Sequence, residues 1–192
     1  MIDDAQRNLI ESGGNNIFFR TRLRKTMKLM QSCYRHTVLD LGGDNLMRRI
    51  LAHELEIEFV GTGEMNLDNF SPTKLIELTV KAGMCTAFEI LEHLVNPYLL
   101  LHTLSRAGMP LIATVPLRFP LSKQYWGKDK YDRHYNEFEP RQFQWLLNEA
   151  GYDILHEEYW KLPLNFVGLR PFLRAFIQPT WMAVLAIPKD LD

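Results

Sequence analysis

Residues Val38–Gly43 of this 192-residue chain have the sequence VLDLGG, an apolar run that ends in two glycines. Residues 37–41 are largely β-branched and apolar, which is typical of a buried parallel strand, and the two glycines after them are typical of a tight turn. A helix predicted over residues 46–54 follows at once. Glycines let the backbone approach a ligand closely, and a helix start presents free N–H groups to an anion, so the stretch predicts a binding turn. A plain strand–turn–helix, with glycine present for its backbone freedom, is the alternative.

Apolar runs and helical segments alternate along the rest of the chain. Further strands are predicted at 57–63, 84–91, 110–115, 153–160 and 181–187, and further helices at 17–31, 71–83, 96–107 and 139–150. The helix that begins after Ser71 has serine as its N-cap, Pro72 at its first position and Gly83 just past its end. This alternation predicts an α/β fold with a mostly parallel sheet covered on both faces. The last two strands predict a closing antiparallel hairpin.

Length and composition limit the class of protein. A chain of 192 residues fits one domain, and a formal net charge of −1 argues against a broadly basic surface for nucleic acid. Cys33 and Cys85 lie far apart without the spacing of a zinc site or a disulfide framework. No apolar run approaches the ~20 residues that span a bilayer, and the N-terminus is acidic and polar. We therefore expect a soluble, cytoplasmic protein.

A second stretch, Phe88–Pro97 with the sequence FEILEHLVNP, gathers two carboxylates and an imidazole where a strand gives way to a helix. On a helical turn, Glu89, Glu92 and His93 occupy positions i, i+3 and i+4 and can point to one side. Three interpretations stay open. Glu92 can interact with the helix N-terminus beside a packing histidine. Alternatively, His93 or His134 can accept a substrate proton near neutral pH, or the cluster can bind a divalent cation.

Four motifs in this order resemble those of the class I S-adenosylmethionine-dependent methyltransferases. They are residues 38–43, 88–97, 111–116, and the HYNEF and EAGY elements within residues 134–152. The chain is similar to the small-substrate, EVLEHL-type branch, which is methyltransferase-11/23-like. The resemblance implies a Rossmann-like, three-layer αβα fold in a single methyltransferase domain over residues 1–192. Its parts would be an N-terminal helical segment (1–36), a cofactor-binding half (37–116) and a substrate-side half (117–192).

The activity that this resemblance implies is methylation by a transferase that uses S-adenosyl-L-methionine. Oxygen in a small molecule or a sugar-lipid intermediate is the expected acceptor. The catalytic candidates are His93, Glu92 and His134. No stable nucleic-acid partner is expected.

The resemblance also places the cofactor beside the first strand. Asp40 is expected next to the cofactor ammonium. Glu64, 24 residues later, is expected to accept hydrogen bonds from the ribose hydroxyls, with Asp68 as the second choice. The other cofactor-side candidates are Gly42, Gly43, Asp44, Met65 and Glu89.

Two features depart from the family pattern. Asp44 and Asn45 stand where the family usually has a further glycine, so Asp44 is expected to face the cationic end of the cofactor or to cap the helix from Asn45 onward. Residues 68–85 contain one helix and no clear third strand, so either residues 66–70 form a shortened strand or part of the adenine pocket is absent. These departures motivate an alternative, a catalytically silent methyltransferase-like binding module.

Glu89, Glu92 and His93 further resemble the ligands of the magnesium-dependent branch, which includes ubiquinone-pathway O-methyltransferases and small-RNA 2′-O-methyltransferases. His134 would supply or support a fourth ligand. A Mg²⁺ ion there would lower the pKa of an acceptor hydroxyl. An RNA 2′-O-methyltransferase is accordingly a third hypothesis, to which the basic residues of the 17–31 helix add support. A solvated helix face is the simpler interpretation of those charges.

Acceptor specificity is expected in two segments near the carboxyl ends of the strands, where ligands bind in open α/β sheets. The segments are residues 117–135, with Tyr125, Trp126, Tyr131 and Arg133, and residues 162–179, with Phe166, Arg170, Phe172, Arg174 and Phe176. Aromatic side chains interspersed with arginines suit an anionic or ring-bearing acceptor.

Overall fold

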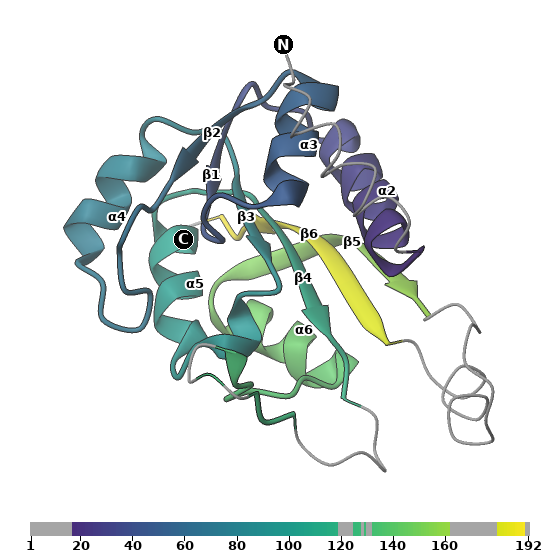
Figure 1. Cartoon of the computed structure of the whole chain (residues 1–192). Helices are drawn as coiled ribbons and strands as arrows, with labels where there is room; N and C mark the ends of the chain where they lie inside the picture. Colours follow the sequence, from purple (N-terminus) through teal and green to yellow (C-terminus); the bar gives the residue numbers. More distant parts are fainter. Residues whose placement is uncertain (1–16, 119–124, 128, 130–131, 162–179, 191–192) are drawn as a thin grey trace, which may run out of the picture.

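The computed structural model of the chain describes residues 17–118, 125–127, 129, 132–161 and 180–190. These residues form a six-stranded sheet with helices on both faces (Figure 1). The strands are β1 (Thr37–Asp40), β2 (Glu58–Gly61), β3 (Cys85–Phe88), β4 (Leu111–Pro116), β5 (Tyr152–Trp160) and β6 (Trp181–Pro188). The helices are α2 (Ile17–Ser32), α3 (Leu46–Leu55), α4 (Pro72–Thr79), α5 (Pro97–Arg106) and α6 (Pro140–Glu149), with a short 3₁₀ helix η1 (Leu91–His93) before α5.

The strands follow the order β2-β1-β3-β4-β6-β5 across the sheet. β1 pairs in parallel with β2 and β3, and β3 pairs in parallel with β4. β6 runs antiparallel to both β4 and β5. The predicted α/β architecture, a mostly parallel sheet that closes with an antiparallel hairpin, is therefore confirmed.

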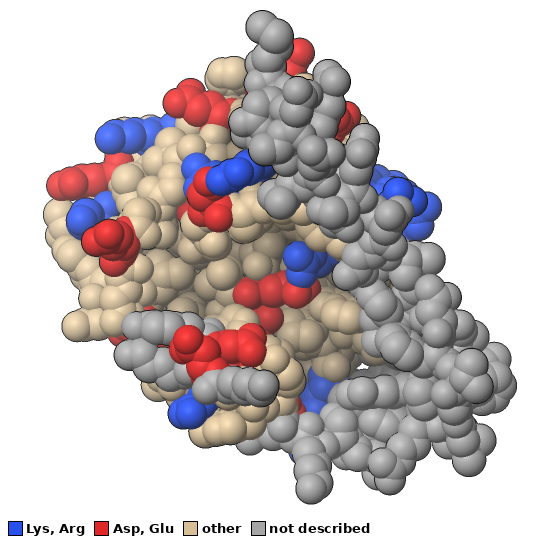
Figure 2. Space-filling model, in the orientation of Figure 1, with Lys and Arg blue, Asp and Glu red and all other residues tan. Residues whose placement is uncertain are grey.

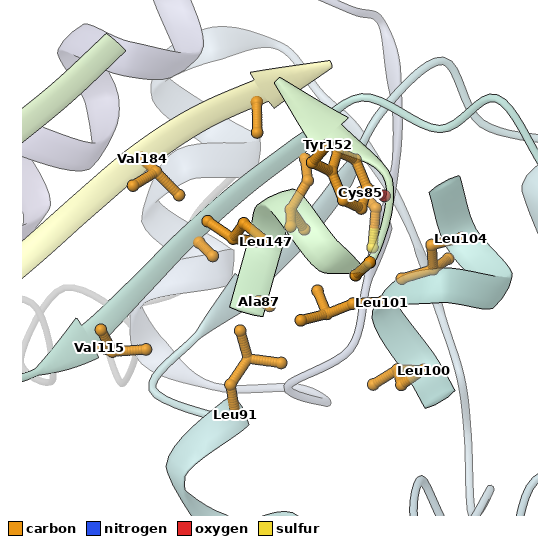
Figure 3. Packing of buried hydrophobic residues seen from close by; sticks show 14 of the residues in the cluster. Cys85, Ala87, Leu91, Leu100, Leu101, Leu104, Val115, Leu147, Tyr152 and Val184 are labelled. Atoms are coloured by element: carbon orange, nitrogen blue, oxygen red, sulfur yellow. The ribbon is translucent and has the colours of Figure 1, made fainter. Parts of the chain in front are cut away.

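Alternation along the strands assigns the helices to the two faces of the sheet. Successive strand residues point to opposite faces, so Val38 packs in the cluster that includes Leu51 of α3, whereas Leu39 packs in the cluster that includes Leu101 of α5 and Leu147 of α6. Figure 3 shows this second cluster, with α5 and α6 side chains against the strands. Burying one leucine side chain contributes ~1.5–3 kcal/mol to the free energy of unfolding, so packing on both faces stabilises the sheet and the positions of its strand ends.

Several helix ends carry ordinary capping signals. The Asn96 side chain caps α5 by accepting a hydrogen bond from the Leu99 N–H at 3.3 Å. Gly108 and Gly151 follow α5 and α6 with φ values of 73° and 91°, a left-handed conformation that glycine adopts without strain. The prediction for Gly83 was wrong, because α4 ends at Thr79 and Gly83 has no left-handed φ.

The strand order reverses direction at β1, and this reversal locates the site. From β1 the chain moves to β2 on one side, and after α4 it returns to β3 on the other side. Such a switch point opens a crevice at the carboxyl ends of the two central strands, here β1 and β3. Between β2 and β3, within the described part of the chain, α4 is the only helix or strand, so residues 66–70 do not form a shortened strand.

Two further features concern the cysteines and the helices. Cys33 and Cys85 are both free, and burial raises the pKa of the Cys85 thiol well above its usual value. None of the helices in the described ranges combines the length and the apolar character needed to cross a bilayer.

Candidate functional site

Asp40 is the last residue of β1 and lies at the switch point with its side chain almost fully buried. The Thr86 hydroxyl, from the neighbouring β3, donates a hydrogen bond to Asp40 Oδ1 at 2.8 Å. Asp40 Oδ2 is buried without a hydrogen-bond partner among the described residues. Burial raises the pKa of Asp40, while the Thr86 hydrogen bond and the Arg48 charge oppose that shift. A buried carboxylate oxygen without a donor is the arrangement that a cationic ligand group would satisfy.

The glycine turn after β1 is open on one side. Gly43 has φ of 68°, and a Cβ atom placed there would meet no heavy atom within 4 Å. A Cβ on Gly42 would contact Ile90 Cδ1 at 3.4 Å. The turn is therefore open on the Gly43 side.

Asp44 does not cap α3, so that part of its prediction was wrong. Asn45 caps α3 instead, since its side chain accepts a hydrogen bond from the Arg48 N–H at 3.0 Å. The Asp44 carboxylate is exposed and bonds the guanidinium of Arg49, with Nε to Oδ1 at 3.0 Å. Asn45 is the N-cap residue because it directly precedes the first helical residue, Leu46.

The ribose-side candidates lie in the turn after β2. Glu64 is exposed there, and Met65 packs against the main hydrophobic cluster. Asp68 has a structural role, because its Oδ1 accepts hydrogen bonds from the Val95 and Asn96 N–H groups at 2.7 and 3.2 Å. Asp68 is thus engaged in holding the fold, which leaves Glu64 as the better of the two predicted ribose ligands.

Glu89 leaves the sheet directly after β3 rather than lying on a helical turn. Its φ is 57°, and it is followed by η1, so the predicted i, i+3, i+4 helical arrangement is wrong. The Glu89 carboxylate forms an ion pair with Arg22 of α2 across the sheet edge. Burial raises the pKa of Glu89, and the Arg22 charge opposes this. Arg22 therefore belongs to the site, although its helix was interpreted from the sequence as a solvated face.

Glu92 lies on η1 with its side chain almost fully buried. Burial raises its pKa to about 8, and the nearby Glu89 carboxylate adds to the shift. The Glu92 backbone carbonyl accepts hydrogen bonds from the N–H groups of Tyr135 and Asn136 at 2.8 and 3.0 Å. These two bonds tie η1 to the segment that carries His134.

His93 and His134, predicted as catalytic candidates, are brought together by this tie. Their ring centroids lie 4.9 Å apart in an edge-on arrangement. His93 Nδ1 lies 3.0 Å from the Arg133 carbonyl oxygen. A carbonyl can only accept, so Nδ1 carries the proton and Nε2 is the basic nitrogen of the neutral ring. Burial lowers the pKa of His134, which favours its neutral form.

The predicted metal set of four residues is only partly assembled. Ligand atoms of Glu92, His93 and His134 lie within 4.8 Å of one another, whereas Glu89 pairs with Arg22. Mg²⁺ prefers oxygen ligands, whereas the three clustered groups offer two imidazoles and only one carboxyl. These residues do not fit a magnesium site.

The acceptor-side segments are described in part. Arg133 lies over the ring of Trp126, with its guanidinium carbon 4.5 Å from the ring centroid, and the ring of Tyr125 lies 4.7 Å from that of His134. Tyr131 and the predicted segment 162–179 lie outside the described residues. Near the middle of the face in Figure 2, acidic and basic side chains lie next to one another and the surface is recessed.

Sequence reasoning missed three residues that shape this site, namely Thr86, Arg22 and Arg48. Thr86 is the one hydroxyl side chain in the apolar run 84–88, which is a usable signal for a functional contact. Arg22 and Arg48 are arginines on amphipathic helices, and nothing local distinguishes them from surface arginines. Their partners, Glu89 and Asp40, are far away in sequence.

Solved structures share this fold, although their sequences are remote. A S-adenosylmethionine-dependent methyltransferase from Archaeoglobus fulgidus aligns with a TM-score of 0.57 and 17% identity, covering 96% of this chain and 100% of that chain. The 1,6-didemethyltoxoflavin-N1-methyltransferase of Burkholderia thailandensis, solved with S-adenosylhomocysteine, has a TM-score of 0.56 and 14% identity over 97% of this chain and 88% of that chain. No protein-family model and no curated protein matches the chain.

Proposed function

We propose that this chain, which has the fold of the class I S-adenosylmethionine-dependent methyltransferases, is itself such an enzyme and methylates oxygen in a small molecule or a sugar-lipid intermediate. The observation that carries the proposal is Asp40, whose buried Oδ2 lacks a donor among the described residues at the switch point, beside an open glycine turn. Fold likeness alone would not carry an activity.

The residues present fit the amino-acid end of S-adenosylmethionine. Asp40 would receive the ammonium, and the turn at Gly42 and Gly43 leaves the backbone open to close approach. Glu64 would take the ribose hydroxyls, with Met65 beside the adenosine. When bound, the cofactor supplies an electrophilic methyl group on a sulfonium. Orienting that methyl against an acceptor is the main contribution that the protein makes to the rate.

The imidazole pair favours a hydroxyl acceptor. A hydroxyl loses its proton when it takes a methyl group, and His93 Nε2 is a basic nitrogen held in one tautomer by the Arg133 carbonyl. His93 accepts that proton, and His134 lies beside it in a neutral form. Glu92 is largely protonated at neutral pH and adds little negative charge to the site. Trp126 and Arg133 offer a stacking and cationic surface for a ring-bearing or anionic acceptor.

A catalytically silent binding module is the second candidate, and the sheet supplies a reason for it. Between β2 and β3 the described residues form no further strand, so the strand that the family resemblance led us to expect beside the adenine is absent from this part of the sheet. A protein of this kind would keep the fold and have no affinity for the cofactor.

Isothermal titration with S-adenosylmethionine and S-adenosylhomocysteine, with and without Mg²⁺, separates the two candidates. The enzyme hypothesis expects micromolar binding that Asp40→Asn weakens about tenfold or more, because the ammonium loses its charged partner. Asp153→Asn, at an exposed position on β5, is the matched control and should bind normally. Absent binding by a well-folded sample would support the silent module. A screen of hydroxyl acceptors for S-adenosylhomocysteine production then tests turnover.

A further inference from the structure

Arg48 reaches from α3 to the carboxyl ends of β1 and β2. Its Nη2 donates a hydrogen bond to the Phe59 carbonyl at 2.9 Å, and its guanidinium carbon lies 5.5 Å from the centroid of the Phe59 ring. The side chain is 19% exposed. The guanidinium is thus anchored at Phe59, and the side chain is only partly buried.

Gly61, the last residue of β2, leaves room for this guanidinium. A Cβ atom at that position would lie 3.0 Å from Arg48 Nη1, closer than side chains normally approach. Its φ is not in the left-handed region, so the backbone conformation does not require glycine there. Space for Arg48 is the physical reason that a residue without a side chain fits.

Arg48 and Asp40 lie side by side without a direct hydrogen bond. Arg48 Nη1 is 4.0 Å from Asp40 Oδ2, beyond hydrogen-bond distance, and Oδ2 has no other donor among the described residues. One buried carboxylate and one partly buried guanidinium therefore lie next to each other at the switch point. An α-amino acid carries its ammonium and its carboxylate on a single carbon, so it matches this pair with opposite charges.

The start of α3 is a poor alternative site for that carboxylate. Helix N-termini attract anions, but Asp44 stands at this one and carries a negative charge, and the Asn45 side chain already occupies the Arg48 N–H. The Arg48 side chain offers a cation that does not depend on the N–H groups of the helix start. The Asp44 charge and the Asn45 cap therefore do not stand in its way. A guanidinium also binds a carboxylate with two parallel donors.

We propose that Arg48 binds the α-carboxylate of the methionine moiety of the cofactor, while Asp40 receives its ammonium. This assignment rests on the proposed function. It gives the chain a cofactor-binding residue on the helix that follows the glycine turn, in place of the missing third glycine.

The test compares S-adenosylhomocysteine with its decarboxylated analogue, S-adenosyl-3-thiopropylamine, which keeps the ammonium and lacks only the carboxylate. The wild-type protein should prefer S-adenosylhomocysteine by about 10- to 100-fold in a titration, the size expected for a charged hydrogen bond.

Arg48→Gln should abolish this preference by weakening the binding of only the carboxylate-bearing ligand. Arg48→Lys should restore part of it, and Gly61→Ala, which displaces the guanidinium, should reduce it. Arg106→Gln, an exposed substitution on α5, should leave it unchanged.

The outcomes separate this inference from the proposed function. If the wild-type protein binds S-adenosylhomocysteine and Arg48→Gln keeps the full preference, the carboxylate assignment is overturned and the enzyme hypothesis stands. Equal weakening of both ligands by Arg48→Gln would also overturn it, because Arg48 would then only support the edge of β2. If the wild-type protein binds neither ligand, the proposed function falls and the inference falls with it.

Discussion

His93 Nδ1 and the carbonyl oxygen of Arg133 are 3.0 Å apart, and this contact fixes which nitrogen of His93 is basic. The carbonyl comes from the segment that also carries His134, so the same backbone sets the tautomer of one imidazole and positions the second. Because this contact leaves Nε2 as the basic nitrogen of His93, replacing His93 tests whether that nitrogen takes part in catalysis.

His93→Asn should lower turnover by about 10²–10⁴-fold, the usual contribution of a general base, and leave S-adenosylhomocysteine affinity nearly intact. The asparagine amide can still donate to the Arg133 carbonyl, so the fold should be kept while the basic nitrogen is lost. Steady-state kinetics and titration measure the two quantities. His53→Asn, at an exposed position of α3, is the control, and unchanged turnover in His93→Asn would remove His93 from the mechanism.

Glu92→Gln should make the protein increasingly more stable than the wild type as the pH rises from about 4.5 to about 8. The pKa of Glu92 is about 8 in the folded protein against an ordinary value of 4.5, so folding favours its protonated form. In the wild-type protein this contribution to the free energy of unfolding is complete below pH 4.5. It is lost progressively as the pH rises through 8, where the folded protein also releases the Glu92 proton. Each unit of pKa shift corresponds to ~1.4 kcal/mol, so the final difference should be of order a few kcal/mol.

Urea unfolding of both proteins at intervals across this pH window measures that difference. A constant offset between the two proteins would show that the carboxyl of Glu92 titrates normally. The prediction therefore requires that the difference between the two free energies of unfolding grows with pH. A gain for Glu92→Gln that is the same at every pH is not enough.

Arg22→Gln should reduce the free energy of unfolding by ~1–2 kcal/mol, because it leaves the largely buried Glu89 carboxylate without its cation. Removing the charge as well, in Arg22→Gln with Glu89→Gln, should restore most of the loss. Arg49→Gln breaks an exposed ion pair with Asp44 and should cost less than ~1 kcal/mol. A double variant no more stable than Arg22→Gln alone would show that the ion pair is not what links α2 to β3.

Gly43→Ala should destabilise the protein by ~1 kcal/mol through its backbone alone, since φ is 68° and no heavy atom would contact the new Cβ within 4 Å. Gly42→Ala should cost less, because its φ is ordinary and its Cβ would meet Ile90 at normal contact distance. Chemical denaturation without ligand gives both values. The reverse order would mean that space at the turn, and not backbone conformation, selects the glycines.

Most helices and strands could be predicted because their signals are local. Asn96 caps α5 by accepting from an N–H three residues away, and Gly108 and Gly151 end helices by their own φ values, so a window of a few residues contains the whole cause. Prediction from local signals was wrong where two neighbouring residues could both act as the helix cap. At Asp44 and Asn45 both side chains can cap, and only the position of the first helical residue decides between them.

The candidate site was predicted less completely, because spacing does not fix direction. The separation of Glu89, Glu92 and His93 suits one helical turn, yet the strand ends with Glu89 in a left-handed conformation and a 3₁₀ helix follows. Glu89 therefore meets Arg22, 67 residues away, instead of joining the cluster with His134. Asp68 similarly was a ribose candidate by sequence and is a support for the start of α5 in the structure.

The alternation of strands and helices, the glycine turn after Asp40 and the closing hairpin follow from local sequence, since they depend on periodicity and on hydrogen bonds between near neighbours. The charged pairs do not: Arg22 meets Glu89, Arg48 lies beside Asp40, and His93 lies against His134 only in the folded chain. The physical reason is that packing of the helices on the sheet sets these distances, and burial then sets the pKa values that give each group its chemistry.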